Sequence, residues 1–272
     1  MWAQFLREFL TALQFFTRLP ITGALAQWVG YSPALLRASA AHFPGMGWIV
    51  GGLTALLHAL LLAALPEGGH SPLLAATLST AFSVWLTGGL HEDGLADLVD
   101  GLGGGYTRER VLEIMKDSRI GAFGVMALVL ALLLKVLLLA VLSEHGVELA
   151  VLALFLAHVV SRGLPLILIR CLPHVGDLAG SKSKPLADQI SVRSLCIGAL
   201  WVVLALLVGA DSLEWSGLLL ALACDGLAWV WMWRLLLRRL QGFTGDCLGA
   251  TQQLCELAFY LGLVLALGLV AA

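Results

Sequence analysis

The chain alternates long apolar stretches with shorter polar connections. Stretches of about 20 predominantly apolar residues, the length that crosses the hydrocarbon core of a bilayer, recur along its whole length. A membrane β-strand would instead alternate polar and apolar residues over about ten positions, which runs such as VMALVLALLLKVLLLAVL do not. The pattern predicts an all-α integral membrane protein with a single polytopic domain over 1–272. The seven expected transmembrane helices cover about 45–65, 71–90, 120–142, 147–170, 194–210, 215–233 and 253–272.

Composition narrows the class further. Hydrophobic residues make up 60% of the chain and charged residues only 12%, whereas an ordinary soluble domain has roughly 25% charged residues. The 16 Lys and Arg against 18 Asp and Glu give a net charge of −2, so the chain has no basic excess for binding nucleic acid. The five cysteines show no C-x-x-C spacing and indicate neither a disulfide framework nor a zinc site.

The positive charges predict the orientation, because cytoplasmic loops retain Lys and Arg. Fourteen of the 16 fall in alternate segments, Lys182 and Lys184 among them, while 66–70, 143–146 and 211–214 contain none. This alternation predicts a cytoplasmic N-terminus and an outer C-terminus. The first 20 residues interleave five aromatic residues with charges, which predicts an amphipathic helix in the membrane interface.

The segment GGLHEDGLADLVDGLGGGYTRERVLEIMKDSRIGAFG contains the most informative polar cluster. If the second span continues into it as a helix, Asp93, Asp97 and Asp100 share one face, with Glu92 beside them. Like charges so placed repel unless a cation lies between them, and Mg²⁺ prefers oxygen ligands completed by substrate phosphates. We therefore expect a cytoplasmic active-site segment at about 91–119; a merely solvated acidic loop is the alternative.

Basic residues follow the acidic cluster. Lys116 and Arg119, in the last part of that segment, are expected to bind phosphate oxygens, since arginine's planar fork suits them. Each is equally explained as a topology marker. His91, at the cytoplasmic edge, is a further candidate for substrate contact.

Several charged residues lie within spans or at their edges. Arg162 and Asp225 lie at matching depth, so we expect them to pair with each other or to face a common cavity; a structural ion pair is the alternative. Asp246 is a candidate metal ligand or helix N-cap, and Glu256 is a further candidate ligand. Lys135 is expected to extend toward the outer surface, and no role is assigned to it.

Five blocks together resemble the cobalamin synthase (adenosylcobinamide-GDP ribazoletransferase) family. They are LTALQFFTRLP near the start, FPGMGWIVGG at 43–52, GGLHEDGLADLVDGL at 88–102, MKDSRIGAFG at 115–124 and GDCLGA at 245–250. The acidic block also resembles the CDP-alcohol phosphotransferases, whose pattern is D-x-x-D-G-x-x-A-R. HEDGLAD lacks the Ala-Arg step, and this departure favours cobalamin synthase.

The resemblance implies an inner-membrane, Mg²⁺-dependent enzyme that joins adenosylcobinamide-GDP to α-ribazole, or to its 5′-phosphate, and releases GMP. Its site would face the cytoplasm, and the sequence leaves a homo-oligomer open. We expect Asp93, Asp97 and Asp100 to be catalytic. The expected metal ligands are Glu92, Asp93, Asp97, Asp100 and Asp246, and the expected substrate-binding residues are His91, Lys116, Arg119, Arg162 and Asp225. The alternatives are a CDP-alcohol phosphotransferase and, from another class, a transporter of a cobalamin precursor.

Overall fold

The computed structural model describes residues 2–176, 189–210 and 212–270, and within them it is all-helical. Long helices dominate it: α4 (Phe43–Ala64), α5 (Ser71–Thr87), α6 (Leu90–Gly104), α8 (Ala122–Glu144), α9 (Val147–Cys171), α11 (Val192–Ala210), α12 (Trp215–Arg239) and α13 (Gly245–Val270). Shorter ones are α1 (Trp2–Phe16), α2 (Gly23–Val29), α3 (Pro33–Ser39), the 3-10 turn η1 (Ala40–His42) and α7 (Arg108–Ile114). Lys182 and Lys184 lie outside the described residues.

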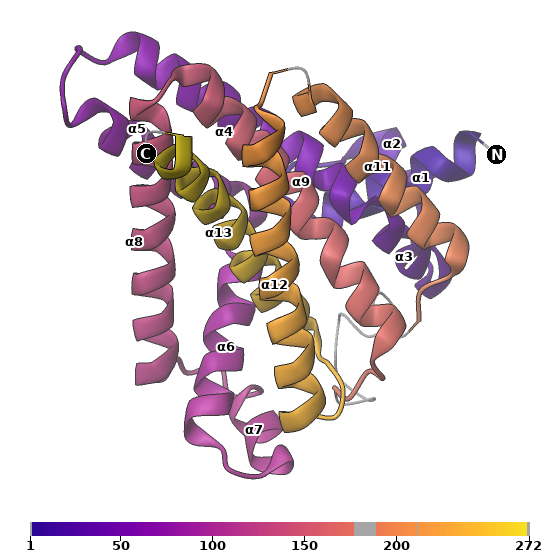
Figure 1. Ribbon diagram of the computed structural model, residues 1–272. Coiled ribbons are helices and arrows are strands. Elements are labelled where there is room, and N and C mark those ends of the chain that lie inside the picture. The colour runs from indigo at the N-terminus through magenta and orange to yellow at the C-terminus, as the bar shows by residue number, and fades with distance from the viewer. Residues whose placement is uncertain (1, 177–188, 211, 271–272) are drawn as a thin grey trace.

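The described helices confirm the expected spans. Six are long and apolar enough to cross a membrane, and the pair α5 and α6 adds a seventh if it forms one broken span. In Figure 1 the α4–α5 and α8–α9 turns lie at the top, whereas α7 and the α12–α13 connection lie at the bottom. For these four segments, the two ends of the bundle agree with the division that the charge pattern predicts.

The second span does not continue straight into the acidic segment. Gly88 and Gly89 both have left-handed backbones, with φ of 71° and 72°, a conformation that is costly for other residues. They end α5, and α6 departs from it at an angle of 88°. The condition of one continuous helix is therefore not met, although Asp93, Asp97 and Asp100 still lie together on a helix of their own.

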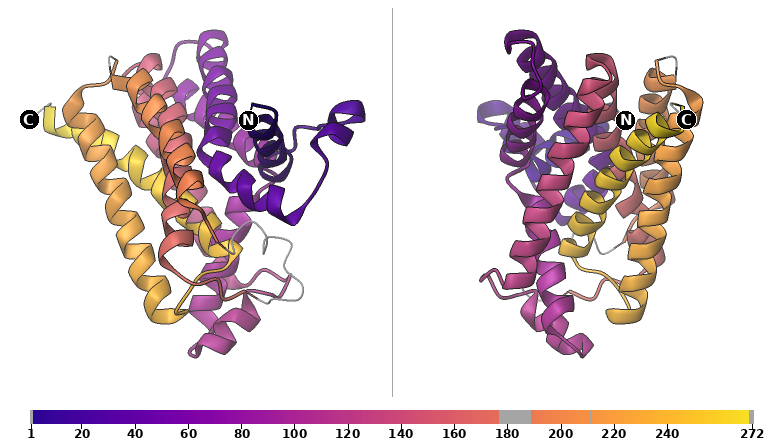
Figure 2. Two further views of the ribbon diagram at one scale, coloured as in Figure 1. Left: turned by 90° about the vertical axis from the view of Figure 1, so that its right-hand side faces the viewer. Right: turned by 60° about the vertical axis from the view of Figure 1, so that its left-hand side comes forward.

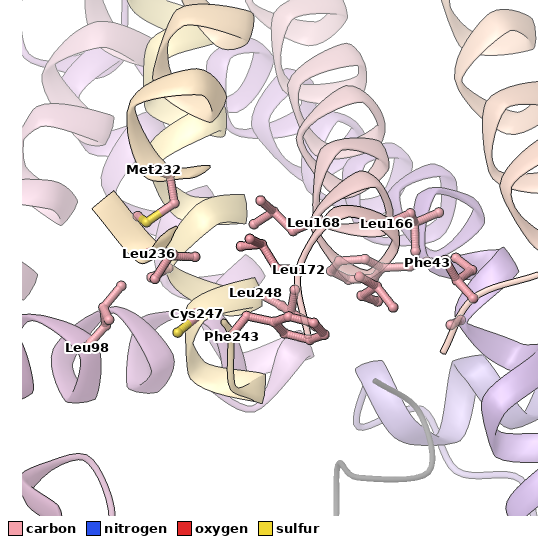
Figure 3. Close-up of a cluster of buried hydrophobic side chains, with 14 of the residues drawn as sticks. Phe43, Leu98, Leu166, Leu168, Leu172, Met232, Leu236, Phe243, Cys247 and Leu248 are labelled. Atoms are coloured by element: carbon pink, nitrogen blue, oxygen red, sulfur yellow. The ribbon is translucent and has the colours of Figure 1, made fainter. Parts of the chain in front are cut away.

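Helix α13 is the centre of the bundle. It packs against α6, α8, α9 and α12, and Figure 2 shows it crossing the bundle obliquely. Glycine permits its close approach to α12, because a Cβ atom on Gly262 would lie 2.5 Å from the Cα atom of Ala221. Below this crossing an apolar cluster joins α9, α12 and α13 to α6 through Leu98, as Figure 3 shows.

The N-terminal helices form a flank beside α11 (Figure 1). Ser32 caps α3 by accepting a hydrogen bond from the Leu35 amide at 3.0 Å, and Arg7 of α1 donates to the carbonyl oxygen of Val29 at 2.8 Å. Helix α1 buries Glu8 against the bundle while Trp2 stays 85% exposed. This two-sided character agrees with an amphipathic helix at the edge of the membrane domain.

Candidate active site

Two acidic side chains of α6 line a cavity at the α5–α6 bend. Asp93 is exposed and Asp97 half-buried; four residues apart, they share one helix face. The cavity has a volume of about 530 Å³, and Glu92 borders it from the same helix. Its other walls come from the end of α1, the bend itself, the segment before α8, and α8: Phe15, Thr87, Gly88, Gly89, Leu90, Ala96, Ser118, Ile120 and Leu128.

A further carboxylate comes from the first turn of α13. Asp246 accepts a hydrogen bond from the Thr244 hydroxyl at 3.2 Å. Gly94 lets the two helices meet there, since a Cβ atom on it would lie 2.7 Å from the carbonyl oxygen of Asp246. Carboxylates from both helices lie near enough to Asp97 to repel its charge, namely Asp246 of α13 and Asp93 and Asp100 of α6. The bend and the glycine contact thus bring like charges together, although α6 and α13 lie far apart in the sequence.

The carboxylate cluster fits a hard divalent cation that is shared with substrate. Among the described residues, no three His, Cys, Asp or Glu side chains converge as a ready-made metal cage. Mg²⁺ usually takes only one or two carboxylates and completes its shell with water and phosphate oxygens. Like-charged side chains beside an open cavity suit that mode of binding, since a cation offsets their repulsion.

Asp100 makes different contacts from those of its neighbours. Its two carboxylate oxygens accept hydrogen bonds from the amides of Gly121, at 2.6 Å, and Gly124, at 2.8 Å. These amides belong to the start of α8, where free N–H groups favour a negative charge. A Cβ atom on either glycine would collide with the Asp100 carboxylate. Asp100 therefore joins α6 to α8, and its expected roles as metal ligand and catalytic residue stay predictions.

The basic residues lie beside a neighbouring cavity. Arg119 donates to Asp117, with Nη2 at 2.6 Å from Oδ2, and these hydrogen bonds lower the pKa of Asp117 to about 2. Both line a second cavity of about 430 Å³, which Asp100 and Arg110 also border. Lys116 is exposed just after the end of α7. Arg119 lies close to the acidic cavity as well, because its two chain neighbours form part of that cavity's wall.

Comparison with known proteins settles the family. A family model described as cobalamin-5-phosphate synthase matches residues 8–264. The chain belongs to this family. A relative from Albidiferax ferrireducens is 59% identical, with 97% of this chain and all of the relative covered; one from Vibrio cholerae is 41% identical, with 94% and 92% covered. Both are named adenosylcobinamide-GDP ribazoletransferase. No solved structure matches the chain.

Three of the substrate-binding residues predicted from the sequence, namely His91, Arg162 and Asp225, are buried and line neither cavity. Arg162 donates to the carbonyl oxygen of His158 at 2.8 Å, and its guanidinium lies 5.7 Å from the ring centre of Phe43. The imidazole of His91 stacks on the same phenyl ring. Asp225 instead lies against α13, where a cysteine thiol is 3.8 Å from its carbonyl oxygen.

The expected pairing of Arg162 with Asp225 is wrong, because the two side chains have different neighbours. The carboxylates that attract the Arg162 guanidinium are those of Glu256 and Glu92. Matching depth along two helices does not specify which faces those helices turn toward each other. The substrate-binding roles of Arg162, Asp225 and His91 stay predictions.

Sequence reasoning missed a buried ion pair. Lys135 of α8 lies 2.6 Å from Glu256 of α13, and the two side chains are 2% and 1% exposed. The expectation that Lys135 extends toward the outer surface is therefore wrong, and Glu256 pairs with a lysine instead of joining Asp246. The sequence did contain a signal for this pair, because Lys135 and Glu256 carry opposite charges within two predicted spans. Each charge is costly inside a membrane without a partner.

Proposed function

We propose that this chain is an adenosylcobinamide-GDP ribazoletransferase. The relatives that share its whole length bear that name, and the cavity lined by Asp93 and Asp97 suits a diphosphate substrate with its metal. The transferred group is adenosylcobinamide phosphate, and the acceptor is a ribose hydroxyl of α-ribazole or of its 5′-phosphate. The carboxylate cluster beside an open cavity is the structural observation that carries the proposal.

In the proposed reaction, the acceptor oxygen forms a bond to the phosphorus of adenosylcobinamide phosphate. The bond from that phosphorus to the oxygen of GMP breaks, and GMP leaves with the bonding electron pair. The acceptor's proton passes to a carboxylate of the site or to solvent. Transfer of this kind depends on positioning and on stabilising charge at the phosphoryl and leaving oxygens.

The chain's own residues divide these tasks. Asp93, Asp97 and Asp246 would hold Mg²⁺, which when bound neutralises charge on the diphosphate. Arg119 and Lys116 would bind phosphate oxygens of the departing GMP from the neighbouring segment. The walls of the cavity would orient the acceptor against the diphosphate.

The proposed location follows from the charge pattern. The acidic cavity and α7 belong to segments that the positive charges assign to the cytoplasm. The protein is then a multi-pass protein of the inner membrane whose active site opens toward the cytoplasm, where nucleotide-activated substrates are available.

A substrate comparison tests the proposed function. Detergent-purified protein is given adenosylcobinamide-GDP with α-ribazole, or a CDP-activated lipid with an alcohol acceptor, each with Mg²⁺ or with EDTA. We expect GMP and a cobamide only from the first pair and only with the metal. CMP release from the lipid donor, or no nucleotide release from folded protein, would contradict the proposal. Substrate flux into liposomes without GMP release would instead indicate a transporter.

A further inference from the structure

A chain of hydrogen bonds crosses the interior of the bundle and ends at the acidic cavity. It joins α8 to α13 and α13 to α6, and every side chain in it is at least nine-tenths buried. We call it the relay; its members, in order, are Lys135, Glu256, Gln252, Gln253 and Glu92.

The second member of the relay, Glu256, is a carboxylate that can only accept hydrogen bonds. Glu256 receives the Lys135 ammonium at 2.6 Å on Oε1, and the Tyr260 hydroxyl donates to the same oxygen at 3.1 Å. Its Oε2 accepts from the Gln252 amide nitrogen at 2.6 Å. The amino group of Gln252 must therefore face Glu256, since an amide oxygen there would meet a second acceptor.

The orientation of the Gln252 amide in turn determines which group of Gln253 faces Glu92. With its nitrogen turned to Glu256, Gln252 presents Oε1 to the amino group of Gln253 at 3.0 Å. The other N–H of that amino group reaches Glu92 Oε1 at 3.1 Å. The ion pair thus fixes the direction of both amides, so that Glu92 receives a donor.

The far end of the relay leaves one oxygen of Glu92 available. Oε2 has no hydrogen-bond partner within the part of the chain that the structure describes, and Glu92 borders the 530 Å³ cavity. A buried carboxylate oxygen without a partner is costly, and a small shift of the Glu92 side chain toward the cavity would let a substrate hydroxyl or bound water satisfy it.

Stability alone is a weak reason to keep such a relay. Replacing a buried ion pair by apolar side chains of similar volume is often neutral or stabilising. We propose that Lys135, Glu256, Gln252 and Gln253 are positioning residues that hold the Glu92 carboxylate in one orientation at the active site. This inference rests on the proposed function for its catalytic consequence.

Four proteins test the last link: wild type, Gln253→Met, Glu92→Gln and the double variant. Turnover is measured as GMP release, and stability as the melting temperature in detergent. We expect Gln253→Met to lower kcat about tenfold with little change in KM, and to cause no further loss when Glu92 is already Gln. A loss of equal size in both backgrounds would overturn the positioning role.

A matched control lies in the same turn of α13. Thr251 is buried and donates to the Cys247 carbonyl oxygen at 2.6 Å, outside the relay. Thr251→Val removes a buried hydroxyl while keeping a side chain of similar size, and its effect on kcat should be small and equal in both backgrounds. If Thr251→Val reproduced the behaviour of Gln253→Met, the relay would have no special role.

The origin of the relay is tested by Lys135→Met combined with Glu256→Gln, which removes both charges of the ion pair. Because buried Arg162 then loses one of the two carboxylates near it, the melting temperature is measured beside kcat to show that the double variant is folded. We expect the same kcat loss as in Gln253→Met; unchanged kcat would restrict the relay to its last two members and contradict the proposal. If wild type releases no GMP, the proposed function fails. The hydrogen-bond link between Gln253 and Glu92 is then tested by the melting temperatures alone. Because a glutamine at position 92 could still accept from Gln253, this comparison uses Glu92→Met, and additive effects of Gln253→Met and Glu92→Met on melting would overturn the link itself.

Discussion

At the scale of residues, the helical spacing of Asp100 does not decide whether its carboxylate binds a metal or the N-terminus of another helix. It follows Asp93 and Asp97 at helical intervals, but its oxygens accept from the amides of Gly121 and Gly124. A carboxylate suits a helix N-terminus as well as a metal, and only packing distinguishes the two. We expect Asp100→Ala to lower the free energy of unfolding by about 1 kcal/mol, measured by thermal unfolding in detergent. Asp97→Asn should leave the free energy of unfolding unchanged or raise it, because it removes one of several charges that repel each other. Equal stability of Asp100→Ala and wild type would contradict this structural role.

At the scale of elements, the apolar pattern predicted the spans but missed the bend between α5 and α6. Two glycines in an apolar run are compatible with a helix, and their left-handed backbones are visible only in the structure. Nothing lies within 4 Å of a Cβ atom on Gly89 or on Gly226 in α12, but only Gly89 has a positive φ. Gly89→Ala should therefore cost about 1 kcal/mol and reduce turnover by shifting α6, while Gly226→Ala should be neutral or stabilising. Unfolding temperatures and GMP release check both; matching behaviour of the two variants would contradict a strained bend.

At the scale of the whole molecule, hydropathy and charge predicted the alternation of the spans because both act segment by segment. The side-chain pairs inside the bundle, such as Lys135 with Glu256, depend on which faces of two helices meet. The sequence of one helix alone does not specify that contact. We expect a reporter that is active only outside the cytoplasm to work when fused after His70 or His145 and to fail after Tyr106 or Gln241. The reverse pattern would invert the membrane orientation and place the acidic cavity on the outer side.

Whether the carboxylates of α6 and α13 form the active site is tested by the Mg²⁺ dependence of GMP release by purified Asp97→Asn beside wild type, with Glu109→Gln as control. Glu109 is an exposed carboxylate of α7 that lines neither cavity, and its loss should not matter. We expect metal-dependent release by wild type and by the control, and a loss of about 100-fold or more for Asp97→Asn. Undiminished, metal-dependent turnover by folded Asp97→Asn would contradict the claim that the carboxylates of α6 and α13 form the active site.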